Sequence, residues 1–111
     1  MIRFTHRVTN FQNLELMCDG HSGEKGSSLP CAAASALIAA ACEALRKRNP
    51  PRLRIETEDG SCHIWCEYNQ HTAEIAMTVI CGFEWLAAQA PEDVSCERMR
   101  SREQREKKFF E

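Results

Sequence analysis

The spacing of apolar residues along this chain changes in one order, and that order occurs twice. Residues 2–9 and 14–19 alternate between apolar and polar side chains, which is typical of half-buried strands. The alanine-rich residues 31–47 that follow have the composition of a helix. Alternation returns from residue 53 to residue 66, and a helical stripe covers 72–90. The chain therefore predicts strand, strand, helix, strand, strand, helix.

The connections between these segments agree with that order. Pro30 suits the first turn of a helix, and Asn49-Pro50-Pro51 stops the same helix. Asp59-Gly60 is a strong signal for a two-residue hairpin between strands 53–57 and 62–66. The simplest arrangement is an α+β, two-layer fold, in which one four-stranded sheet carries both helices on one face.

The second face of such a sheet must be polar or covered. Met17 and Trp65 alternate with the residues assigned to the core, so they point to this second face. An exposed apolar pair of this kind suggests that a second copy of the chain packs there.

Length and composition fit one domain, placed at residues 1–94, with a charged tail at 95–111. We expect residues 97–111 to be a solvated helix or disordered. The net charge of −2 is not that of a protein built around nucleic-acid binding. No apolar run reaches the roughly 18 residues of a membrane span, and no signal-peptide core is present. We therefore expect a cytoplasmic protein without membrane contact.

Seven cysteines, an odd number without a secretory signal, indicate reduced thiols rather than a disulfide framework. We expect most of them to be buried as small apolar side chains. Cys31 differs because it falls in the first turn of the first helix, where backbone amides and the helix dipole favour an anion. A thiolate there is a nucleophile, and nearby amides such as that of Ala32 can stabilise an oxyanion.

A histidine lies ten residues before Cys31, at the end of the second strand. A loop with several glycines separates them, so His21 can fold back toward the sulfur. A cysteine paired with a histidine is sufficient for nucleophilic acyl transfer. The alternatives from position alone are a buried structural thiol and a solvated histidine.

Two further interpretations stay open for this segment. Cys18, His21 and Cys31 could supply three zinc ligands, with His71 or Cys66 as the fourth. Ser35 shares a helical face with Cys31 and either hydrogen-bonds near the site or bonds back to its own helix.

The motif at residues 20–37 resembles the ribosomal-processing cysteine protease (Prp) family of bacteria. The matching features are Gly20-His21, a glycine-containing loop, and the run "CAAASAL" from Cys31 to Leu37. The order of strands and helices agrees to about residue 90. The chain departs from the family pattern at Ser22, in a shorter loop, at Ser28 where the family has aspartate, and at Leu29-Pro30.

The resemblance implies that the protein removes an N-terminal extension from a bacterial large-subunit ribosomal protein. It implies Cys31 as nucleophile and His21 as general base and then acid. Gly20, Ser28, Ala32 and Ser35 would bind substrate or support the site. It also implies a homodimer, and neither a metal nor another cofactor.

The tail offers a second class of function. Its basic residues could contact ribosomal RNA weakly, so a ribosome-associated binding protein without catalysis is the main alternative to a protease. A small zinc-binding module is the other alternative.

Overall fold

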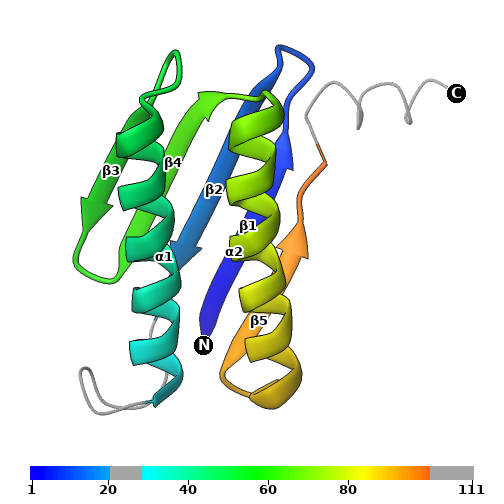
Figure 1. Cartoon of the computed structure of the whole chain (residues 1–111). Helices are drawn as coiled ribbons and strands as arrows, with labels where there is room; N and C mark the ends of the chain where they lie inside the picture. Colours follow the sequence, from blue (N-terminus) through cyan, green and yellow to red (C-terminus); the bar gives the residue numbers. More distant parts are fainter. Residues whose placement is uncertain (21–28, 101–111) are drawn as a thin grey trace, which may run out of the picture.

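Strand β2 (Asn13–Asp19) lies in the middle of a five-stranded mixed sheet, in a computed structural model that describes residues 1–20 and 29–100. The sheet order is β3-β4-β2-β1-β5 (Figure 1). The other elements are β1 (Ile2–Val8), α1 (Leu29–Arg48), β3 (Arg54–Glu58), β4 (Ser61–Glu67), α2 (Gln70–Gln89) and β5 (Val94–Arg98).

The two predicted strand pairs are present as antiparallel hairpins, and antiparallel pairing of β2 with β4 joins them. The prediction of four strands is wrong, because β5 pairs in parallel with β1. Only Val94 and Cys96 are apolar in this strand, and the alternation ends in a run of charged residues. For this reason the sequence pattern predicts residues 95–98 as part of the charged tail. Residues 101–111 of that tail lie outside the described residues.

Both helices lie on one face of the sheet, as predicted (Figure 1). The core lies between these two layers. Phe4 of β1 and Phe83 of α2 stack with ring centroids 4.0 Å apart, and both side chains are fully buried. This contact holds α2 against β1.

Helix α1 is less central than its composition suggested. Only four of its residues are buried: Ala34, Ala41, Cys42 and Leu45. By length and composition alone this 20-residue helix could cross a membrane. The sequence pattern predicts no apolar run long enough for a membrane span, because the helix predicted at 31–47 is shorter. In the fold it packs instead against α2, and the close approach is at Gly82, where an added Cβ would lie 2.6 Å from Leu37 Cδ2.

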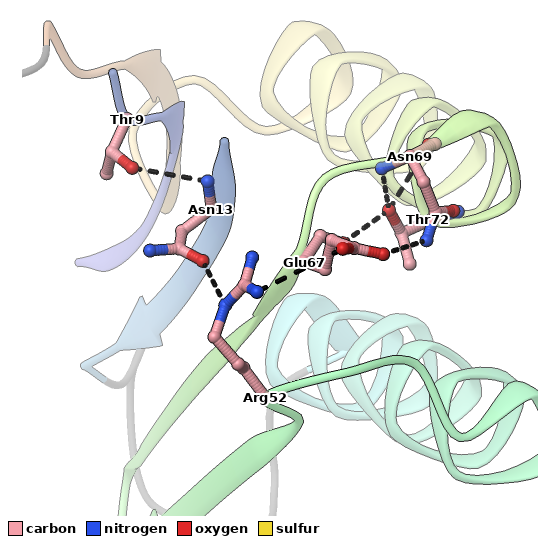
Figure 2. A network of polar contacts seen from close by, with 6 residues as sticks. All are labelled: Thr9, Asn13, Arg52, Glu67, Asn69 and Thr72. Carbon is pink, nitrogen blue, oxygen red and sulfur yellow. Dashed lines mark hydrogen bonds and ion pairs between the residues drawn. The ribbon is translucent and has the colours of Figure 1, made fainter. Parts of the chain in front are cut away.

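A polar network closes the end of the sheet at which α2 begins (Figure 2). The Asn69 side-chain oxygen accepts a hydrogen bond from the Thr72 backbone N–H, and the Thr72 hydroxyl accepts one from the Asn69 backbone N–H. The Asn69 side-chain Nδ2 also donates to the Glu67 carboxylate at 3.0 Å. Arg52 lies 4.0 Å from Glu67 and donates to Asn13 at 2.9 Å. The network thus caps α2 and ties it to both hairpins.

Polar and charged side chains cover part of the sheet face that has no helices. Glu15 is 8% exposed, and its carboxylate accepts hydrogen bonds from Arg7 Nε and His63 Nε2, each at 2.5 Å. The His63 ring stacks on the Trp65 ring, and the Arg54 guanidinium lies 5.0 Å from the Trp65 ring centroid. Charged hydrogen bonds of this kind offset part of the cost of burying the carboxylate.

Replacing Gly20 should destabilise the fold. Gly20 has φ +98°, and an added Cβ would lie 2.1 Å from the Met1 carbonyl oxygen. We expect Gly20→Ala to lower the free energy of unfolding by about 1–3 kcal/mol in urea titrations. Gly82→Ala is the control, because its only close neighbour is the flexible end of Leu37, and the change should stay within about 1 kcal/mol. Equal losses in both variants would contradict this account.

The pH dependence of stability should contain a contribution from Glu15. Burial raises the pKa of this carboxyl, but hydrogen bonds from Arg7 and His63 outweigh that effect, so the pKa lies below its ordinary value of 4.5. The stabilisation is therefore present above pH 4.5 and is lost as the pH falls through the lower folded-state pKa.

We expect Glu15→Gln to lower the free energy of unfolding by about 1–3 kcal/mol at neutral pH and by much less at about pH 3. Urea unfolding at several pH values measures this difference. Glu43→Gln is the control, because Glu43 pairs with Arg46 on an exposed helix surface, where a pair contributes at most about 1 kcal/mol. A Glu15→Gln deficit that does not depend on pH would be inconsistent with this role.

Candidate active site

The end of β2 is held against the β3–β4 hairpin at the point where the chain leaves toward α1. The Gly20 amide donates a hydrogen bond to the Gly60 carbonyl at 3.0 Å. Gly60 has φ +82° in the turn after Asp59, as the hairpin signal predicted. This bond places Gly20, at the end of β2, beside the hairpin turn.

Cys31 occupies the first turn of α1, as predicted. Its side chain is partly buried and packs against the hydrophobic core. It also lines a cavity of about 610 Å³. Cys31 is therefore at the border between the core and an accessible space, at the end of a helix where the dipole favours negative charge.

The cavity lies between α1 and the β3–β4 hairpin. Its apolar wall includes Ile2 and Ile38, and its hairpin wall is formed by residues 57–61. Glu43 and Arg46, which are 3.2 Å apart, add charged groups on the helix side. A cavity of this volume and mixed lining can hold an extended segment of a few residues.

The structure brings together four of the six residues that the sequence predicted for the site. Cys31, Gly20, Ala32 and Ser35 all line the same cavity. Ser35 is exposed and lies one turn after Cys31. His21 and Ser28 lie outside the described residues, so their roles stay predictions.

Three further cysteines line the cavity, and the sequence analysis did not assign them to it. They are Cys18, Cys42 and Cys62. Burial, together with Asp19 and Cys31, raises the pKa of Cys18 to about 12. Burial and the neighbouring Cys42 thiol also raise the pKa of Cys62. The Cys18 and Cys62 thiols are therefore held in the protonated form.

One of the three could have been found from spacing. Cys31, Ser35, Ile38 and Cys42 recur at helical intervals and so share one face of α1. The other two depend on the pairing of β2 with β4, which places Cys18 directly opposite Cys62. No local pattern in the sequence predicts that two separate hairpins pair in this register.

The zinc interpretation is not supported by the arrangement of its ligands. Cys66 pairs with Leu14, at the end of the sheet away from Cys18, and His71 begins α2 at that same end. Neither can reach an ion bound to Cys18 and Cys31. Within residues 1–20 and 29–100, no group of three or more metal-ligating side chains could hold an ion.

A protein-family comparison gives one match. The profile of the cysteine protease Prp matches residues 1–95. A search of curated proteins finds no match.

Solved structures have a similar fold. The ribosomal processing protease Prp from S. aureus, in complex with a covalently linked product peptide, is similar with a TM-score of 0.76 and 23% identity. That match covers 89% of this chain and 100% of the other. The same protease in complex with a substrate peptide gives a TM-score of 0.71 and 21% identity, with coverage of 89% and 100%. SMU.848 from Streptococcus mutans is similar with a TM-score of 0.70 and 26% identity, and the match covers 92% of this chain and 96% of that one.

Proposed function

The chain belongs to the cysteine protease Prp family, and we propose that this cysteine protease removes an N-terminal extension from a bacterial large-subunit ribosomal protein with Cys31 as its nucleophile. The family match over residues 1–95 includes the whole strand-loop-helix segment that carries Cys31. The names of the S. aureus structures, a ribosomal processing protease bound to substrate and product peptides, support this class of substrate.

The position of Cys31 is the observation that carries the proposal. It is the thiol at the start of a 20-residue helix, and it lines a cavity that can hold a peptide. The pKa of Cys18 is raised to about 12, and that of Cys62 is also raised, mainly by burial in both cases. A protonated thiol is a poor nucleophile, so these neighbours do not compete for the reaction.

The proposed reaction is acyl transfer in two stages. The Cys31 thiolate attacks the carbonyl carbon of the scissile peptide bond, and backbone amides at the start of α1 stabilise the oxyanion. His21 takes the thiol proton and gives it to the leaving amine. Water then hydrolyses the thioester and regenerates Cys31. The proposed chemistry needs no metal or cofactor.

The substrate should lie in the cavity between α1 and the β3–β4 hairpin. Its apolar wall fits apolar side chains of the peptide, while Glu58 and Asp59 place negative charge at the hairpin turn. The peptide would therefore extend from Cys31 between α1 and the β3–β4 hairpin.

We also propose a compartment, an oligomeric state and a contact for the tail. The protein acts in the cytoplasm, where the ribosomal substrate is found, and it acts as a homodimer. The partly exposed Met17 and Trp65 on the helix-free face of the sheet support a contact with a second copy. The charged tail is proposed to contact ribosomal RNA weakly.

Removing the nucleophile or its base should abolish cleavage. We expect Cys31→Ala and His21→Ala to lower the rate of cleavage of the organism's own ribosomal-protein N-terminal peptide by about 10³-fold or more. Cleavage is measured by mass spectrometry of the products.

Two cysteines away from the cavity provide matched controls. Cys81 is exposed on α2 and Cys66 is buried in β4, so alanine at either position should leave the cleavage rate unchanged. Cleavage that survives Cys31→Ala would exclude the proposed nucleophile. A peptide left intact by the unaltered protein would favour a ribosome-associated binding role instead.

Filling the cavity should weaken substrate binding. Ala39 is exposed and lines the cavity, so Ala39→Trp would occupy it without disturbing the core. We expect the KM for the peptide to rise about tenfold or more, with an unchanged melting temperature. Ala40→Trp is the control, because Ala40 is an exposed neighbour on the same helix outside the cavity lining. An equal KM in both variants would place the substrate elsewhere.

A further inference from the structure

Four thiols line the cavity that contains the proposed nucleophile. They are Cys18, Cys31, Cys42 and Cys62, and they come from β2, α1 and β4. The acyl-transfer mechanism uses one of them. A core position needs only a small apolar residue, so packing alone gives no reason for three further thiols around a reactive one.

The three remaining thiols are adjacent to one another. Cys18 and Cys62 are directly opposite across the β2–β4 pair, where side chains on one face have Cβ atoms about 5 Å apart. The Cys62 and Cys42 sulfurs are in contact at 3.9 Å. Cys31 and Cys18 line the same cavity, and Cys31 contributes to the raised pKa of Cys18. The four thiols thus follow one another along the cavity as a series from Cys31 through Cys18 and Cys62 to Cys42.

We propose that this series is a reversible oxidation site, in which oxidation of Cys31 by hydrogen peroxide ends as a disulfide between Cys42 and Cys62. The inference rests on the proposed function in one respect, because it takes Cys31 as the reactive thiol.

The proposed oxidation has four steps. The Cys31 thiolate attacks peroxide and becomes a sulfenic acid, with loss of hydroxide. The Cys18 thiol displaces water from it and forms a Cys31–Cys18 disulfide. Cys62 gives its proton to the hydroxide formed in the first step, attacks the Cys18 sulfur and releases Cys31 as a thiolate. Cys42 then attacks the Cys62 sulfur, and its proton passes to the Cys18 thiolate that leaves. Overall, two thiols and one peroxide give one disulfide and two waters.

The final pair needs little movement. A disulfide requires a sulfur–sulfur distance of about 2.05 Å, so the two sulfurs must approach by roughly 2 Å from contact. Cys42 lies on α1 and Cys62 on β4, and both line the cavity between these elements. The Arg46 guanidinium nearby favours the Cys62 thiolate during exchange.

The consequence is protection of the nucleophile. A sulfenic acid left on Cys31 would oxidise further to the sulfinic acid, which is irreversible for most proteins. Transfer of the oxidation to Cys42 and Cys62 returns Cys31 to the thiol, and a reducing thiol such as dithiothreitol restores the original state. The disulfide also joins the two walls of the cavity.

The test is disulfide mapping of the full-length protein after treatment with one equivalent of hydrogen peroxide and alkylation. Chymotrypsin cleavage after Leu37 and Trp65 separates Cys31 from Cys42 and Cys62 from Cys66. We expect a Cys42–Cys62 cross-link within one chain, reversed by dithiothreitol. Cys31→Ala should slow its formation about tenfold or more, because burial raises the pKa of Cys18 and of Cys62. Cys18→Ala should leave sulfinic acid on Cys31.

Cys66→Ala is the matched control, because Cys66 is a buried thiol on the same strand outside the cavity lining, and it should behave as the unaltered protein. Circular dichroism confirms that each variant is folded. A cross-link that forms as fast in Cys31→Ala, or no cross-link within the chain, would overturn the proposal.

The readout is independent of peptidase activity. If the peptide is cleaved with Cys31 as nucleophile but no Cys42–Cys62 disulfide forms, the oxidation site fails and the proposed function stands. If the disulfide forms through Cys31 while the peptide stays intact, the proposed function fails and the oxidation site stands.

Discussion

The structure depends on the antiparallel pairing of β2 with β4. This pairing joins two hairpins that are separated by a helix in the sequence, and its register sets Cys18 opposite Cys62 and Asp19 opposite Ser61. The hydrogen bond from Gly20 to Gly60 continues it by one step beyond the strand ends. Without this register the β3–β4 hairpin would not form one wall of the cavity, and the start of α1 would have no groove beside it.

The same geometry gives Cys31 a different environment from Cys18 and Cys62. Cys18 and Cys62 face the core, where burial raises their pKa and keeps them protonated. Cys31 lies at the start of a helix and at the edge of the cavity. A single cavity thus contains one thiol at the start of a helix and two buried thiols, Cys18 and Cys62, whose pKa is raised. This contrast comes from position within the fold, since the side chains are chemically identical.

The sequence predicted those features that repeat locally. Alternation revealed β1 to β4, the alanine-rich run revealed α1, and the Gly-His and Cys31 motif revealed the family. It missed β5, because Val94 and Cys96 are too few to show alternation before the charged residues begin. It also missed Cys62 and the hairpin wall of the site, because these depend on pairing between distant strands. It placed α1 too centrally, because an exposed alanine and a buried one look the same in a sequence.

The account is tested most directly by a crystal structure of the protein after reaction with a peptide chloromethyl ketone that carries the ribosomal-protein cleavage sequence. We predict a covalent bond to the Cys31 sulfur, with the peptide lying between α1 and the β3–β4 hairpin. A bond to any other cysteine, or a peptide bound on the helix-free face of the sheet, would contradict it.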